Sequence, residues 1–325
     1  MSSPLAVYPA SAGERDRWIV ARRGARALVD PLKPYAFLTE EERFASGEIG
    51  SVATLFLTNR ECPFRCAMCD LWMHTLTETV PVGAIAGQVA YALSRLESSG
   101  LEAARQIKLY NSGSFFDARA IPVEEYAAIA RQVQRFERVI VESHPAFVGE
   151  RCWRFSEMPG VQLEVAMGLE TAHPVALERL NKRMTLAQYA RAAEELGERG
   201  IALRAFVLVQ PPFMRVEEAL EWACRSVDFA FGCGATAVSL LPTRAGNGAV
   251  DALAAMGEFV APALSTVEDA FDYGVGLGKG RVFVDLWEME RVSACAVCRE
   301  TRVERMRRMN LEQVVLERVR CGSCA

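Results

Sequence analysis

The regular alternation of short apolar, β-rich runs with helical patterns between residues 51 and 243 constrains the fold more than any other feature. Strands are expected at 51–58, 106–111, 138–145, 161–171, 201–213 and 235–243. Apolar residues with helical spacing fill the intervals 83–100, 121–136, 185–200 and 216–234. Strands that alternate with helices form a parallel sheet with the helices outside it. The sequence therefore predicts an α/β fold, a partial or full parallel (β/α) barrel.

The chain divides into three expected parts. Residues 1–50 are mixed in composition and predict an N-terminal arm with one or two short helices. The barrel core covers 51–246 and ends at a Gly/Asn-rich turn. A small Cys-rich C-terminal extension follows at 247–325, with a helical stretch over 249–274 and one strand over 281–289.

Composition excludes several classes of protein. The net charge of -4 gives no global basic character that would indicate a nucleic-acid-binding protein. The first residues lack the pattern of a signal peptide, and no uncharged apolar run approaches the roughly 18 residues of a membrane span. We expect a cytoplasmic protein without a membrane partner. In such a chain the 10 cysteines indicate metal or redox chemistry and not a disulfide framework.

Three cysteines follow the first expected strand directly, in the stretch ECPFRCAMCDLW at residues 61–72. Cys62, Cys66 and Cys69 have the spacing C-x3-C-x2-C. In a parallel barrel this position is the carboxyl end of the strands, where active sites are built. A [4Fe–4S] cluster takes one thiolate on each of its four irons when it is fully ligated. Three thiolates therefore predict a cluster with one open iron for a cofactor or substrate; a zinc site or a chance spacing is the alternative.

This motif and its position resemble the radical S-adenosylmethionine (SAM) superfamily. The resemblance implies that SAM binds the open iron through its amino and carboxylate groups. One electron, from a reducing partner such as flavodoxin or ferredoxin, then cleaves a carbon–sulfur bond, and the resulting 5′-deoxyadenosyl radical abstracts hydrogen from a substrate. Many members have an aromatic residue against the adenine just before the third cysteine. Here that residue is Met68, a polarizable substitute.

Small polar residues follow the second expected strand, in the stretch YNSGSFFD. Small residues at such a point let backbone groups approach a ligand closely. The stretch resembles the glycine-rich motif of the superfamily. By that resemblance the methionyl amino group of SAM is held by Asn111, Ser112, Gly113 and Ser114. A simple turn is the alternative.

Charged residues in the later strands are further candidates for contacts with SAM. Glu142 lies near the end of the third expected strand, and we expect it to accept hydrogen bonds from the ribose hydroxyls or the amino group. The stretch GLETAHPVALERLNKRMT resembles the elongator-type and coproporphyrinogen-oxidase-type branch, which implies that Glu170 faces the ribose. A salt bridge at a strand end is the alternative for both glutamates. Arg204 lies in an apolar strand and needs a partner, for which the SAM carboxylate and a structural glutamate pair are equal candidates.

The remaining cysteines and histidines of the barrel carry weaker signals. A cysteine without a partner at metal-ligand spacing is usually a buried small hydrophobic residue. Among these, Cys152 is the candidate hydrogen-atom donor. A histidine at a motif end either donates to substrate or makes a local structural contact, and the second is favoured for His74, His144 and His173.

Four cysteines near the C-terminus form a second pattern, C-x2-C-x22-C-x2-C. They are Cys295, Cys298, Cys321 and Cys324. Four thiolates in two close pairs suit tetrahedral zinc and suit a closed auxiliary [4Fe–4S] cluster equally well. Ligand type alone does not decide between the two, because both accept thiolate. The Arg-rich segment 299–320 between the pairs favours a solvated amphipathic helix over a nucleic-acid contact.

The motifs together span roughly residues 55 to 243 and resemble the radical SAM subunit of archaeosine synthase and its uncharacterised bacterial relatives, in the elongator-type branch. The resemblance implies a barrel of the radical SAM type and an enzyme of lyase- or transferase-like type. The substrate that the resemblance implies is a modified nucleoside in tRNA or a related small molecule. Two alternatives remain: a radical SAM enzyme that modifies a lipid or peptide, and a zinc-ribbon binding module with a degenerate barrel. The intact C-x3-C-x2-C motif argues against the binding module.

Overall fold

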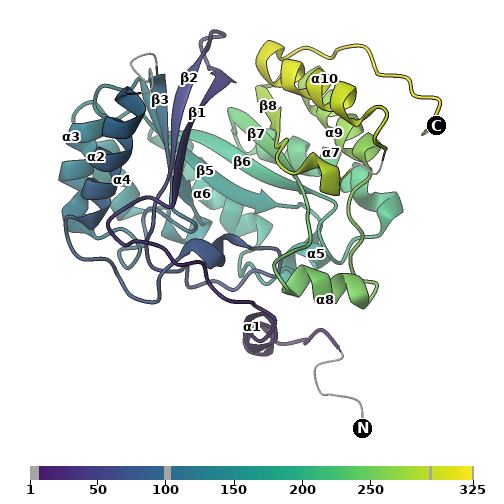
Figure 1. The fold of residues 1–325 in the computed structure, drawn as a ribbon, viewed down its shortest axis with the longest axis horizontal. Coiled ribbons are helices and arrows are strands. Elements are labelled where there is room, and N and C mark those ends of the chain that lie inside the picture. The colour runs from purple at the N-terminus through teal and green to yellow at the C-terminus, as the bar shows by residue number, and fades with distance from the viewer. Residues whose placement is uncertain (1–6, 99–103, 293–294, 324–325) are drawn as a thin grey trace.

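The fold is an eight-stranded mixed sheet that curves into a half-barrel and carries helices on its outer face (Figure 1). The computed structural model describes residues 7–98, 104–292 and 295–323. The strands are β1 (Ala36–Arg43), β2 (Ile49–Phe56), β3 (Ala104–Tyr110), β4 (Arg138–Ser143), β5 (Leu163–Glu170), β6 (Ala202–Val209), β7 (Ala237–Pro242) and β8 (Arg281–Val284). All six strands expected between residues 51 and 243 are present as β2 to β7.

The order of the strands in the sheet follows the order of the sequence, from β1 to β8. Strands β2 to β8 run parallel, and β1 pairs antiparallel with β2. The N-terminal arm therefore contributes a strand as well as a helix, which the sequence analysis missed. Strand β8 pairs with β7, so the sheet extends beyond the predicted core of 51–246 on both sides. Antiparallel β1 needs only a tight turn to reach β2, whereas each parallel pair needs a crossover.

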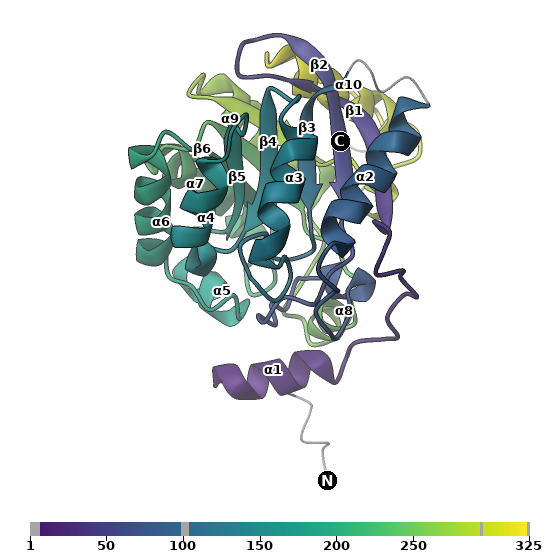
Figure 2. The same cartoon turned by 90° about the vertical axis from the view of Figure 1, so that its left-hand side faces the viewer.

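Helices cover the outer face of the sheet (Figure 2). They are α2 (Ala84–Glu97), α3 (Tyr126–Val133), α4 (Glu150–Ser156), α6 (Leu186–Glu198), α7 (Ala219–Gly232) and α9 (Leu264–Gly276). The main hydrophobic core lies between these helices and alternate residues of the strands, such as Leu55, Leu109, Val141 and Val207. Every residue of β5 is buried, as expected for a central parallel strand with both faces covered.

The other face of each strand points into the half-barrel, because successive side chains of a strand alternate. Charged side chains fill the half of the barrel interior that lies at the amino-terminal ends of the parallel strands. Arg204 lies at the centre: its Nη2 is 2.5 Å from Glu42 Oε1, and its Nε is 2.8 Å from Glu164 Oε1. Lys108 Nζ is 2.6 Å from Glu42 Oε2, and Arg281 Nη2 is 3.4 Å from Glu164 Oε2. This buried ionic layer fills the bottom of the barrel.

The carboxyl end of the barrel is closed by a second apolar cluster. It joins the N-terminal helix α1 (Ala12–Val20) and α8 (Ala249–Ala255) to the loops after β2, β5 and β6. Trp18, Ala67, Leu180, Phe213 and Val250 are among its buried members. The short helix α5 (Pro174–Arg179) belongs to the loop after β5. Figure 1 shows α1 and α8 together below the sheet. The N-terminal arm is therefore packed against the end of the barrel that carries the cysteine motif.

Helix α10 (Arg299–Glu312) lies across the open side of the half-barrel and contacts both β1 and β8 (Figure 1). The predicted solvated helix with i,i+4 pairs is only partly correct, because Arg302 and Arg305 make nearly buried ion pairs with acidic residues of α9, while Arg308 makes an exposed i,i+4 pair. Arg302 pairs with Glu268, Arg305 with Asp272, and Arg308 with Glu312. Within the described part of the chain, no helix is both long enough and apolar enough to span a membrane.

Candidate functional site

The loop that carries Cys62, Cys66 and Cys69 follows β2 at the carboxyl end of the barrel. Neighbouring loops hold its backbone. Ala67 N donates to Leu180 O at 2.9 Å. Asn247 Nδ2 donates to Ala67 O at 2.8 Å and to Cys69 O at 3.1 Å. The loops after β5 and β7 thus fix the cysteine loop between them.

A cluster of charges fixes the start of the same loop. Glu61 forms ion pairs with Arg23 at 2.6 Å, with Arg65 at 3.0 Å and with Arg26. Burial would raise the pKa of Glu61, but the guanidinium groups of Arg26 and Arg23 hold it below its usual value. Two of the three arginines come from the N-terminal arm. The arm is therefore a structural support of the cysteine loop.

The three thiols of this loop do not converge on one point. Among the described residues, the only group of three metal-ligating side chains with ligand atoms all within 4.8 Å of one another lies elsewhere, near the C-terminus. A single tetrahedral metal with bonds of about 2.3 Å holds thiolates about 3.8 Å apart, whereas a cubane cluster binds each thiolate on a separate iron. Burial raises the pKa of Cys62, Cys66 and Cys69. The donor set and its spread suit a cluster better than a single ion.

The glycine-rich loop after β3 lies directly against the cysteine loop. A Cβ added to Gly113 would stand 3.3 Å from Cys62 Cβ, so a side chain there would push the two loops apart. Ser112 has the positive φ of 54°, and its hydroxyl lies 3.1 Å from Tyr35 Oη. Ser114 Oγ accepts a hydrogen bond from His144 N at 2.9 Å. The loop is thus held in a compact shape in contact with Cys62.

Asn111 begins this loop and is fully buried. Its side-chain Oδ1 and Nδ2 both lack a hydrogen-bond partner. A buried amide without partners is destabilising by about 1–3 kcal/mol for each unsatisfied group. Such a group is expected where a ligand or water completes the structure.

Glu142, at the end of β4, supports the backbone of the glycine-rich loop. Its Oε2 accepts a hydrogen bond from Asn111 N at 2.9 Å. Burial raises the pKa of Glu142 to about 7, although the backbone N–H groups of Asn111, Ser112 and Gly113 act in the opposite direction. The predicted role of Glu142 was a contact with SAM itself. In the structure its carboxylate holds the loop that was predicted to bind SAM.

Glu170, at the end of β5, forms a buried ion pair with Lys182, a partner that the sequence analysis did not identify. Its Oε1 lies 2.5 Å from Lys182 Nζ, and each side chain is 9% exposed. A Cβ on Gly168 would meet the ends of both charged side chains, which would have to shift to make room for it. The ion pair is the alternative that we set beside ribose binding for Glu170. Lys182 itself lies inside the stretch GLETAHPVALERLNKRMT. This position was the only feature of the sequence that could have indicated Lys182 as a residue of the site.

The histidines make local structural contacts, as favoured. His144 Nδ1 accepts from Ala146 N at 3.1 Å, so Nε2 carries the proton and donates to Lys182 O at 2.9 Å. Burial lowers the pKa of His144 to about 3. Its ring stacks on Phe64 of the cysteine loop with centroids 3.9 Å apart. His173 caps α5, and His74 stacks on Tyr35.

Two predicted site residues lie away from the site. Arg204 is in the first half of β6, five residues before its end, which puts it about 16 Å from the carboxyl edge. It pairs with Glu42 and Glu164, so the prediction of a SAM carboxylate contact is wrong and the structural glutamate pair is correct. Cys152 lies in α4, within the apolar core outside the sheet. Its place in a covering helix contradicts a role as hydrogen-atom donor in the barrel.

Met68 packs against the apolar cluster formed by the N-terminal arm and α8. Its side chain therefore has a structural role that the sequence did not indicate. The neighbouring Ala67 is fully buried in the same cluster. The segment between the second and third cysteines is anchored by apolar packing as well as by the hydrogen bonds of Asn247.

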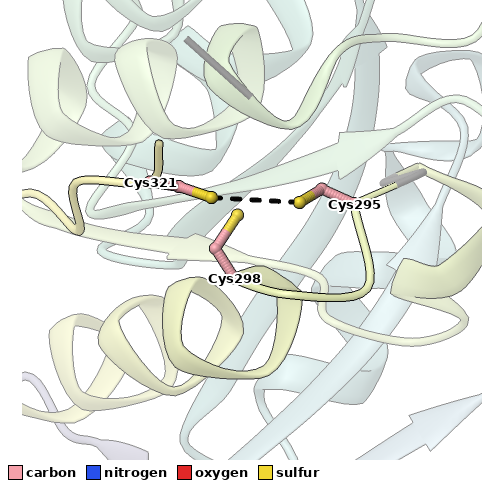
Figure 3. A group of neighbouring side chains, drawn as sticks. All are labelled: Cys295, Cys298 and Cys321. Atoms are coloured by element: carbon pink, nitrogen blue, oxygen red, sulfur yellow. Dashed lines mark hydrogen bonds between the residues drawn. The ribbon is translucent and has the colours of Figure 1, made fainter. Parts of the chain in front are cut away.

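The C-terminal cysteines form a second candidate metal site (Figure 3). Ligand atoms of Cys295, Cys298 and Cys321 all lie within 4.8 Å of one another, and the Sγ atoms of Cys295 and Cys321 are 4.0 Å apart. Arg302 donates a side-chain hydrogen bond to Cys298 and is also paired with Glu268. Cys324, the fourth predicted ligand, lies outside the described residues.

Comparisons with known proteins agree with the sequence motifs. No family model matches the chain. Archaeosine synthase subunit beta of Thermococcus kodakarensis is 31% identical over 150 residues, or 44% of this chain and 46% of the relative. The protein of the same name from Methanosarcina acetivorans is 26% identical over 171 residues, or 51% and 49%. An uncharacterised protein of Methanocaldococcus jannaschii is 26% identical over 235 residues, or 69% of this chain and 64% of the relative.

Among solved structures, Elp3 of the archaeon Methanocaldococcus infernus is similar with a TM-score of 0.52 and 14% identity. The match covers 69% of this chain and 59% of that chain and concerns the fold. The chain thus spans less than two thirds of the length of each of these relatives. The resemblance of the sequence to the archaeosine synthase subunit is confirmed over about half of the chain.

Proposed function

We propose that this protein is a radical SAM enzyme whose first cysteine motif holds a [4Fe–4S] cluster with one iron open to SAM. The observation that carries the proposal is the contact between two loops at the carboxyl end of the barrel. Gly113 of the glycine-rich loop lies against Cys62 of the cysteine loop, where an added Cβ would stand 3.3 Å from the Cys62 Cβ. A cofactor held by one loop would therefore be adjacent to a cluster held by the other.

The residues present suit these two groups. Three thiols that do not converge on one point suit a cluster that binds each on a separate iron. The unpartnered amide of Asn111 supplies both a donor and an acceptor for a polar ligand. Ser112, Gly113 and Ser114 complete that side of the site, with Glu142 behind them as the support of their backbone.

When bound and reduced by one electron, a cluster of this kind supplies the cleavage of SAM that begins hydrogen abstraction from a substrate. The residues of this chain bind, orient and shield. Asn247 and Leu180 fix the cysteine loop through its backbone. The apolar cluster around Trp18 and Phe213 excludes water from one side of that loop.

The proposed substrate is a modified nucleoside, in tRNA or as a related small molecule. The support is the similarity to archaeosine synthase subunit beta over about half of the chain. The arginines of α10 favour the small molecule, because several of them are already paired with acidic residues of this chain. The electron donor in the proposal is a flavodoxin or ferredoxin. A site that needs reduced thiols suits the cytoplasm.

At the C-terminal site we propose a single zinc ion. A separation of 4.0 Å between the Sγ atoms of Cys295 and Cys321 is close to the roughly 3.8 Å that tetrahedral thiolates have around one zinc. A cubane cluster would bind each thiolate on a separate iron and hold the thiols further apart. Cys324 is the proposed fourth ligand, and the hydrogen bond from Arg302 would offset part of the negative charge on Cys298.

The test is anaerobic reconstitution followed by metal analysis and a product assay. The proposal expects about four irons per chain at the first motif and about one zinc at the second. Addition of SAM and dithionite should then release 5′-deoxyadenosine. Cys66→Ala should abolish both the bound iron and the product, while Cys224→Ala, a change on helix α7, should leave both unchanged. A fully loaded protein that releases no deoxyadenosine would overturn the proposed function.

A further inference from the structure

Lys182 is a buried cation beside the cysteine motif. Its side chain is 9% exposed, and within the described part of the chain its one ion pair is with Glu170 at 2.5 Å. The preceding residue, Asn181, donates to Arg65 O at 2.8 Å, directly before Cys66, so Lys182 belongs to a segment that is attached to the cysteine loop. Burial raises the pKa of the Cys66 and Cys62 thiols, and the Lys182 ammonium group acts in the opposite direction on both.

The backbone around this lysine is strained in a way that fixes its position. Asn181 and Arg183, on either side, both have a φ of 60°, and Glu170 has a φ of 64°. Residues other than glycine rarely adopt these values, which cost of order 1–3 kcal/mol each and persist where the surroundings determine them. The surroundings are specific here: the carbonyl of Lys182 accepts a hydrogen bond from His144 Nε2 at 2.9 Å.

The same segment is attached to the cysteine loop. Asn181 Nδ2 donates to Arg65 O at 2.8 Å and to Asp16 Oδ1 at 2.8 Å. Arg183 pairs with Asp16 of α1 at the surface. Of the three consecutive residues, the outer two therefore bind neighbouring segments, and Lys182 alone points inward to Glu170.

We propose that Lys182 is a positioning residue that sets the electrostatic environment of the cluster, and that Glu170 limits its effect. The inference rests on the proposed function. A thiolate-bound cluster becomes more negative when it accepts an electron, so a nearby ammonium group stabilises the reduced form. A nearby carboxylate stabilises the oxidised form. The ion pair therefore gives two opposite controls on the ease of reduction.

The experiment is a redox titration of the reconstituted, full-length protein without SAM or substrate, with dithionite as the one-electron reductant and the electron paramagnetic resonance signal as the readout. Lys182→Gln should move the midpoint potential of the cluster to a more negative value. Glu170→Gln should move it to a more positive value, because the ammonium group is then uncompensated. The double variant should return close to the wild-type potential. Iron content should stay at the wild-type level in all three.

Arg183→Gln is the matched control. It removes one positive charge from the adjacent position, but Arg183 pairs with Asp16 and its side chain is 37% exposed. Solvent screens such a charge, so the potential should not move. Shifts of the same sign in the Lys182 and Glu170 variants, or a shift in Arg183→Gln as large as in Lys182→Gln, would refute the inference. Absence of any cluster in the wild-type protein would instead refute the proposed function.

Discussion

Replacement of Arg204 by methionine tests the ionic layer at the bottom of the barrel. Arg204 is 2% exposed, Glu164 is fully buried and Glu42 is 6% exposed. The change preserves most of the side-chain volume and removes the central charge. Two carboxylates then remain in the barrel interior with fewer partners. We expect the variant to fold with a large loss of stability, and we expect its affinity for SAM to be unchanged.

The structure indicates the size of the loss. Breaking a buried ion pair by removing one partner costs about 3–5 kcal/mol, because the other charge stays buried. Glu42 keeps Lys108 at 2.6 Å, whereas the partners left to Glu164 among the described residues are Arg281 at 3.4 Å and Arg138 at 3.7 Å. The remaining partners offset part of the cost. The expected loss is therefore at the lower end, about 3 kcal/mol.

The loss should depend on pH in a defined direction. Burial would raise the pKa of Glu42, but Arg204 and Lys108 hold it well below its usual value. A carboxyl group with a lowered pKa in the folded state contributes stability above its unfolded pKa of about 4.5, and that contribution is lost as the pH falls. The difference between wild type and Arg204→Met should thus be largest near neutral pH and shrink below about pH 4.5.

Urea denaturation followed by circular dichroism, at pH 7 and at pH 4, measures the free energy of unfolding of both proteins. Arg105→Met is the matched control, since Arg105 pairs with Glu137 at 2.5 Å at the surface, where solvent screens the ion pair. A loss for Arg204→Met no larger than the loss for Arg105→Met would refute the structural role. So would a tenfold weaker affinity for SAM in a variant of wild-type stability.

Three further predictions concern the glycine-rich loop, its support Glu142, and the C-terminal cysteine site. Gly113→Ala should weaken SAM binding at least several-fold, because the new methyl group meets Cys62 Cβ at 3.3 Å. Equilibrium binding without reductant measures the affinity for SAM. An unchanged affinity would contradict the contact between the loops. In wild type, the free energy of unfolding should fall by about 1–3 kcal/mol as the pH rises from 4.5 to 7, because burial raises the pKa of Glu142 to about 7 in the folded state and the folded protein binds the extra proton. Glu142→Gln should flatten this fall. Cys298→Ala should remove zinc but leave the iron content unchanged, and equal loss of both metals in elemental analysis would argue against two separate sites.

The strands and their order were predictable from the sequence because their signals are local. Each parallel strand is a run of β-rich apolar residues bounded by turn residues, and each helix has apolar residues on one face. Strand β1 was missed because its sequence, AFLTEEER, has only three apolar residues, and the other five are polar or charged. Its glutamates are there to pair across the barrel with Lys108 and Arg204. That partnership depends on residues more than 60 positions away, so no local pattern reveals it.

The cysteine motif and the glycine-rich loop were predictable for a related reason. Spacing within eight residues fixes which thiols share a loop, and position after a strand fixes the end of the barrel at which they lie. The role of Arg204 was not predictable to the same degree. The expected strand 201–213 already has Arg204 near its start, but the partners Glu42 and Glu164 are distant in the sequence and no local pattern reveals them.

The glutamates at the strand ends show the same limit from the other side. Sequence placed Glu142 and Glu170 at the carboxyl edge of the barrel, and both are there. It did not reveal that Glu142 binds backbone N–H groups, or that Glu170 binds Lys182. Neither carboxylate belongs to the two loops that meet at Gly113 and Cys62. A polar residue at the carboxyl edge of a barrel can therefore either bind a cofactor or hold the residues that bind it. Substitutions that keep the loop backbone intact are needed to separate these two roles.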